Sequence, residues 1–149
     1  MKELIELHRE YMKKNFPALP EHALPKYKNN DRTTNGLTKC IIDFLKYSGW
    51  QAERISTTGR WIQDKNEHGW RKPTGKWIPS SGTRGSADIS ATIKGRSVKI
   101  EIKRGKDKQS EVQKKYEQQI TNAGGEYWLI YSYNEFRERY SDFCKRLSI

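Results

Sequence analysis

Residues 87–103 read ADISATIKGRSVKIEIK, and this stretch decides the fold. Apolar and polar residues alternate over 87–93 and again over 97–103, on either side of Lys94-Gly95-Arg96. Two alternating runs joined by a short glycine-containing turn predict a β-hairpin. Because strand side chains alternate between faces, one face of this hairpin should be apolar and the other polar.

The polar face of the predicted hairpin carries Asp88 on its first strand and Glu101 and Lys103 on its second. A short turn places Asp88 across from Glu101 or Lys103, with the Cβ atoms about 5 Å apart. Two carboxylates at that distance repel each other unless a cation lies between them. With no His or Cys nearby, these oxygen ligands favour Mg²⁺ or Mn²⁺ over zinc. Such a site, with Lys103 steadying developing negative charge, suits phosphodiester hydrolysis.

A structural interpretation of the same residues stands beside this one. Glu-x-Lys is common on exposed strands, where a cross-strand Glu–Lys pair stabilises slightly without any catalysis.

The residues around the hairpin predict an α/β fold with one domain. Four helices are expected: over 2–14, from Thr34 to just before Gly49, over 111–122 behind a Ser110 cap, and from Asn134 onward. Besides the hairpin, strands are expected over 50–57 and 127–131. The core order is therefore αβββαβ. Residues 1–33 are expected to form an N-terminal helix followed by a proline-containing basic connector, with the helix packed on the body or on a second subunit. Residues 34–133 are expected to form the core and 134–149 a C-terminal helix.

Composition points to a polyanionic partner, because a net charge of +11 on 149 residues attracts phosphates. Nucleic acid is the leading partner class. The alternatives are a membrane surface as partner or a charge that serves only to keep the protein soluble. No apolar run has the length of a signal peptide or a membrane span, so the expected location is the cytoplasm. Cys40 and Cys144 lie far apart and predict reduced thiols.

The segment 58–81 interleaves tryptophans with cations and predicts a flexible hairpin that contacts nucleic acid. Its candidate contact residues are Arg60, Arg71, Lys72 and Lys76, among the rings of Trp61, Trp70 and Trp77. The alternative is that at least one tryptophan packs the segment onto the domain. Arg84 and Lys106 flank the predicted site and are candidates for phosphate contacts.

Asp88, then Glu101-Ile102-Lys103, then Gln113 on the following helix resemble the PD-(D/E)xK nuclease superfamily. The VRR-NUC (virus-type replication-repair nuclease) branch is the most similar, with a glycine-rich lead-in before the Asp (82–87), a Gly after the Lys (Gly105) and a Gly pair before an apolar strand (Gly124-Gly125). The resemblance spans residues 34–133. It implies a restriction-endonuclease-like core with a mixed central sheet flanked by helices.

The resemblance also implies roles. Asp88, Glu101 and the backbone carbonyl of Ile102 would hold Mg²⁺ or Mn²⁺, Lys103 would lie near the attacking water, and Gln113 would assist. Lys115 and Tyr116 would contact the substrate. The family often has an acidic residue where this chain has Asn35, a weaker metal ligand and the candidate fourth active-site position. Asp43 lies more than two turns further along the helix and is badly placed to replace that acid.

The leading hypothesis is a divalent-metal-dependent endonuclease acting on DNA, including branched or structured DNA, for which a homodimer would be suitable. The resemblance suggests a phage or mobile-element setting, and so a bacterial host cytoplasm. The alternatives are a catalytically inactive nucleic-acid-binding module with the same fold and a basic partner-binding protein whose hairpin is purely structural.

Overall fold

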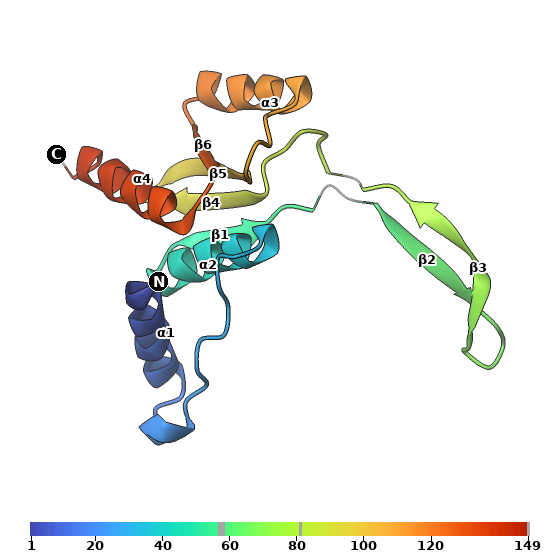
Figure 1. Ribbon diagram of the computed structural model, residues 1–149, viewed down its shortest axis with the longest axis horizontal. Coiled ribbons are helices and arrows are strands. Elements are labelled where there is room, and N and C mark those ends of the chain that lie inside the picture. The colour runs from blue at the N-terminus through green and yellow to red at the C-terminus, as the bar shows by residue number, and fades with distance from the viewer. Residues whose placement is uncertain (57–58, 81, 149) are drawn as a thin grey trace.

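The computed structural model describes residues 1–56, 59–80 and 82–148 (Figure 1). A mixed four-stranded sheet has the order β1-β4-β5-β6, with β1, β4 and β5 antiparallel and β6 parallel to β5. Its strands are β1 (Gln51–Arg54), β4 (Ile89–Ile93), β5 (Arg96–Ile102) and β6 (Glu126–Ile130). Four α-helices accompany them in the described residues, namely α1 (Lys2–Asn15), α2 (Thr34–Tyr47), α3 (Glu111–Asn122) and α4 (Tyr133–Arg146).

The predicted central hairpin is confirmed as β4–β5, with a shorter turn than expected. Lys94 and Gly95 alone form the turn, both with positive φ (48° and 76°), and Arg96 already pairs with Ile93. Two such residues give the turn whose twist matches that of paired strands.

Several element boundaries differ from the sequence predictions, including those of β1, β6 and the last helix. β1 ends at Arg54, earlier than expected, and residue 57 of the predicted strand lies outside the described residues. β6 begins and ends one residue early. The last helix begins at Tyr133 behind Ser132, whose side chain accepts a hydrogen bond from the Glu135 backbone N–H. Asn134 was therefore the wrong start, because a serine two residues earlier caps the helix.

The two faces of the sheet are covered by different helices, as neighbouring residues of β6 show. The Trp128 ring packs on Phe136 and Phe143 of α4, whereas the Tyr127 ring packs on Tyr116 of α3. α2 shares the Trp128 side, where its apolar residues join one core with those of β4 and β5. α3 covers the opposite face (Figure 1), which is the face that carries Glu101.

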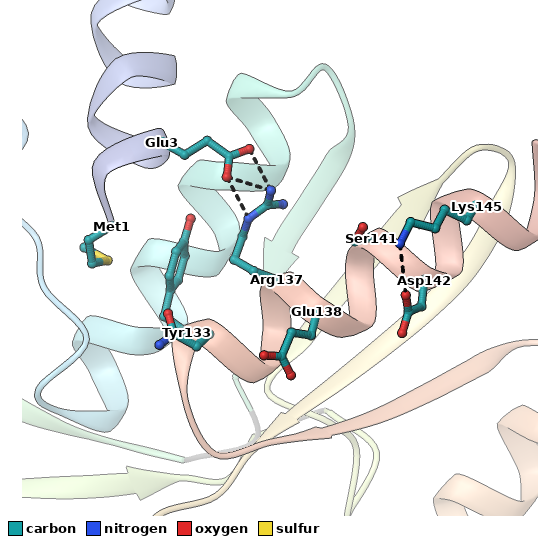
Figure 2. A pocket seen from close by; sticks show the side chains of 9 residues that line it. Met1, Glu3, Tyr133, Arg137, Glu138, Ser141, Asp142 and Lys145 are labelled. Carbon is teal, nitrogen blue, oxygen red and sulfur yellow. Dashed lines mark hydrogen bonds and ion pairs between the residues drawn. The ribbon is translucent and has the colours of Figure 1, made fainter.

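The N-terminal helix packs on the body of the chain. Leu4 is fully buried within the core, and Arg137 of α4 forms a two-pronged ion pair with Glu3 (Figure 2). The same guanidinium lies 4.1 Å from the centre of the Phe44 ring of α2. The connector behind α1 contains a short 3₁₀ turn, Glu21–Ala23, and is held by a hydrogen bond between His8 Nε2 and the Pro25 carbonyl.

The segment predicted as a hairpin forms β2 (Arg60–Lys65) and β3 (Arg71–Ile78), a two-stranded sheet separate from the main one. We call residues 59–80 the arm; residues 58 and 81 of the predicted segment lie outside the described residues. The arm extends away from the body (Figure 1). Its tryptophans do not pack it onto the domain, since Trp61, Trp70 and Trp77 are 56%, 73% and 56% exposed.

Within the described ranges, no helix is both long and apolar enough to cross a membrane. Cys40 and Cys144 are both free thiols; Cys40 is buried and Cys144 partly so.

Candidate functional site

Asp88 lies directly before β4, next to the end of β5. Ile89 pairs with Ile100, so continuing the register by one residue sets Asp88 opposite Glu101. Asp88 Oδ2 accepts a hydrogen bond of 2.8 Å from the Ile102 backbone N–H. This bond fixes the carboxylate against the strand that carries Glu101 and Lys103.

Glu101 and Lys103 form a buried ion pair. The Lys103 Nζ lies 3.2 Å from Glu101 Oε1, and the two side chains are 6% and 5% exposed. An ordinary Glu-x-Lys pair on a strand would be exposed to water, where it contributes little. Burial takes both charges out of water, a cost that further hydrogen bonds offset only in part, so the slight stabilisation of a surface pair does not account for this one.

Gln113 supplies those further hydrogen bonds. Its Oε1 accepts from Lys103 Nζ at 3.0 Å, and its Nε2 donates to Glu101 Oε1. The same Oε1 also accepts from the Ser110 backbone N–H, while the Ser110 hydroxyl accepts from the Gln113 backbone N–H. This reciprocal cap at the start of α3 makes Gln113 a partly buried bridge. Gln113 is therefore not an ordinary exposed residue of the helix surface.

The environment of Glu101 disfavours its charged form. Burial raises the pKa of the Glu101 carboxyl above its usual range, and the nearby Asp88 carboxylate raises it further. The hydrogen bond and the charge of Lys103 oppose this shift. A carboxylate held in this way is well suited to bind a cation, because the cation relieves both the burial and the repulsion.

Two residues that the sequence did not single out also lie at this cluster. Asp107, four residues after Lys103, has an Oδ2 atom 3.5 Å from Lys103 Nζ. Tyr127 is buried, and its hydroxyl has no hydrogen-bond partner among the described residues. Burial and then the Glu101 charge raise the pKa of Tyr127, so the hydroxyl remains a donor. In the structure Tyr127 pairs with Lys99 and so lies on the face of Glu101, a placement that the strand pattern of the sequence does not specify.

The glycine-rich lead-in runs against the first turn of α3. Gly85 has φ +78°, and a Cβ there would lie 2.7 Å from Val112 Cγ1 and 2.8 Å from the Val112 carbonyl carbon. Only glycine allows this approach. The contact sets Arg84 beside the helix that carries Gln113.

The other predicted substrate contacts fall into two groups. Arg84, Lys106 and Lys115 are exposed on the lead-in, the loop after β5, and α3, whereas Tyr116 is partly buried against Tyr127. The second group, Arg60, Arg71, Lys72 and Lys76, lies on the arm and away from the carboxylates (Figure 1).

Asn35 and Asp43 lie on α2, which packs against the face opposite Glu101. The Asn35 Oδ1 atom accepts a hydrogen bond of 2.8 Å from Arg54. Asp43 is buried and accepts from Tyr27, Asn29 and Lys39, which agrees with its expected poor placement for the site. Arg104, directly after Lys103, bonds the carbonyls of Asp31 and Thr33 and so ties the start of α2 to this end of β5.

The donor set suits an ion that keeps some of its own waters. In the described residues, Asp88 Oδ1 and Glu101 Oε2 accept no protein hydrogen bond, and no group of three or more His, Cys, Asp or Glu side chains is placed to hold a metal. Two carboxylates with remaining positions for water or phosphate are typical of Mg²⁺ sites.

Comparisons of the chain with protein-family models, with curated proteins and with solved structures found no match.

Proposed function

We propose that this chain is a divalent-metal-dependent nuclease that hydrolyses phosphodiester bonds in DNA. One observation carries the proposal: Glu101, Lys103 and Gln113 form one hydrogen-bonded cluster, and Asp88, held by the Ile102 N–H, lies beside it, although the four residues span 26 positions of the chain. A buried Glu–Lys pair beside a second carboxylate is costly to stability. Such an arrangement is typical of functional sites, where pKa values are shifted for chemistry.

Each residue has a distinct role in this proposal. Asp88 and Glu101, with the Ile102 carbonyl, would hold Mg²⁺ or Mn²⁺, which supplies a Lewis acid for the phosphate and lowers the pKa of a bound water. Lys103 places a positive charge where negative charge develops. Gln113 is a positioning residue, because it holds Glu101 and Lys103 in fixed orientations. Tyr127 offers a hydroxyl donor on the same face.

Two further features support DNA as the substrate. The order of core elements, α2-β1-β4-β5-α3-β6 with the arm inserted after β1, agrees with the restriction-endonuclease-like core that we propose. The net charge of +11 attracts a polyanion. Branched DNA and a homodimer stay predictions within this proposal.

The decisive experiment measures cleavage of supercoiled plasmid and of branched DNA with Mg²⁺, Mn²⁺ or EDTA. Cleavage should occur with either metal and stop with EDTA. Lys103→Ala should lower the cleavage rate by at least about a hundredfold, because an oriented charge at the reacting phosphate contributes several kcal/mol. Binding in EDTA should persist in this variant, since other cations still contact the DNA. Lys114→Ala, which removes an exposed lysine paired with Glu111, is the control.

The second candidate is a nucleic-acid-binding module that does not cleave. The observation that favours it is Asn35, where related nucleases often carry an acid, already bonded to Arg54. Binding with no cleavage in either metal would establish this candidate in place of the nuclease. Full cleavage by Lys103→Ala would instead show that the active site lies elsewhere.

A further inference from the structure

The arm carries two tryptophans that face the same way. Trp61 of β2 and Trp77 of β3 are direct cross-strand partners, so their side chains lie on one face of the hairpin. Both remain 56% exposed, although burying a tryptophan is among the larger gains that a fold can make. The arm therefore presents its largest apolar side chains to a partner outside the body.

Each of these rings lies against a glycine from the other side of the hairpin, Gly75 of β3 for Trp61 and Gly59, just before β2, for Trp77. A Cβ built on Gly75 would lie 2.7 Å from Trp61 Cε2, and one built on Gly59 would lie 2.6 Å from Trp77 Cε2. Any larger residue at either position would displace the ring. The two rings are thus held in place before a partner arrives, which lowers the entropy cost of binding.

The charge of the arm indicates which partner fits these rings. Residues 59–80 contain five cations and two acids, a net charge of +3. The cations are Arg60, Lys65, Arg71, Lys72 and Lys76; all are exposed, and in the described residues none forms an ion pair. A second copy of the chain would bring the same positive charge, so pairing of two arms is opposed by repulsion. A phosphate backbone is complementary to it.

We propose that Trp61 and Trp77 stack on unpaired bases of a DNA strand while the cations of the arm contact its phosphates. This inference rests on the proposed function for the choice of DNA. Bases within a duplex are already stacked on one another, whereas unpaired bases have free faces for an aromatic ring. The arm thus directs the nuclease site to DNA that has a single-stranded segment beside a duplex.

The test compares two probes in EDTA, where no cleavage occurs. One is a blunt duplex, and the other is the same duplex with a single-stranded thymidine overhang of about ten nucleotides, within the usual site size of such binders. The double variant Trp61→Ala/Trp77→Ala should bind the overhang probe at least about tenfold more weakly, since stacking contributes about 1–3 kcal/mol per base. Its affinity for the blunt duplex should change less than about threefold.

Two control variants separate stacking from other effects. Trp61→Phe/Trp77→Phe keeps aromatic rings and should recover most of the lost affinity. Trp70→Ala removes an even more exposed ring near the tip of the arm, outside the pair, and should leave both affinities nearly unchanged. The overhang should also quench the tryptophan fluorescence of the unaltered protein more than the blunt duplex does.

Three results would overturn the proposal: equal losses for both probes in the double variant, an equal loss in Trp70→Ala, or a protein that sediments as a dimer and becomes a monomer in the double variant. The last would assign the rings to a second copy of the chain. Failure of the nuclease proposal looks different, because overhang binding would then persist while no metal supports cleavage.

Discussion

At the level of single residues, the candidate site holds the charges of Asp88, Glu101 and Lys103 close together, which lowers the stability of the folded protein. Burial and the Asp88 carboxylate both raise the pKa of Glu101. The folded state therefore binds this proton more tightly than the unfolded chain. The stability that protonation of Glu101 contributes is fully present below about pH 4.5, the ordinary pKa of the carboxyl. It is lost as the pH rises through the raised pKa of the folded state.

Asp88→Asn should accordingly stabilise the metal-free protein near neutral pH. The substitution removes one cause of the raised Glu101 pKa, while the amide oxygen can still accept from the Ile102 N–H. We expect a gain at pH 7 that shrinks toward pH 4.5, because the charged form of Glu101 is the one that the Asp88 carboxylate disfavours. Thermal unfolding in EDTA across this pH range measures it. Mg²⁺ should raise the melting temperature of the unaltered protein and leave that of the variant unchanged; a metal-dependent rise in both would contradict the ligand role of Asp88.

Gln113→Ala should reduce cleavage more than it reduces stability. Loss of the bridge frees Glu101 and Lys103 to reorient, and residues that position ligands typically affect activity about 10- to 100-fold. Loss of the bond that the Gln113 side chain accepts from the Ser110 N–H should cost about 1 kcal/mol, since the other half of the cap remains. Gln119→Ala, on the same helix and exposed, is the matched control for both measurements. Equal cleavage rates in the two variants would exclude a positioning role for Gln113.

At the level of elements, local signals predicted most of the boundaries, and tertiary contacts produced the rest. Ser110 and Gly124 bracket α3 in the sequence as they do in the structure. The docking of α3 on the polar face has no local signal, because Gln113 is one of several polar residues on that helix. The burial of Glu101 and Lys103 was therefore not predictable. Nor was the separation of the arm from the main sheet, since strand patterns do not specify which strands pair.

Gly85→Ala should disturb the contact between the lead-in and α3. Both the positive φ and the clash with Val112 oppose a methyl group there, so we expect a loss of about 2–4 kcal/mol in the free energy of unfolding. Gly124→Ala is the control, with φ +79° and open space around the built Cβ, and should cost only about 1 kcal/mol. Chemical denaturation of the two variants gives the comparison. Similar losses would show that the approach to Val112 contributes nothing.

At the scale of the whole molecule, α1 is part of the same packed body as the core. Leu4→Ala should lower the free energy of unfolding by about 2–5 kcal/mol, because it opens a cavity between α1 and the core. Ile5→Ala, on the same helix but 49% exposed, should cost less than about 1 kcal/mol. Urea unfolding followed by circular dichroism measures both. A Leu4→Ala protein as stable as the Ile5→Ala protein would mean that α1 contributes little to the body.

The bridging position of Gln113 has a consequence for synthesis of the protein in a cell. Asp88, Glu101 and Lys103 leave the ribosome before Gln113 does, and α3 must fold and dock before the amide can hold them. The nuclease that we propose would therefore cleave slowly while it is a nascent or partly folded chain. Its full cleavage rate would appear only after α3 has docked, which would limit damage to nearby DNA while the chain is still being made.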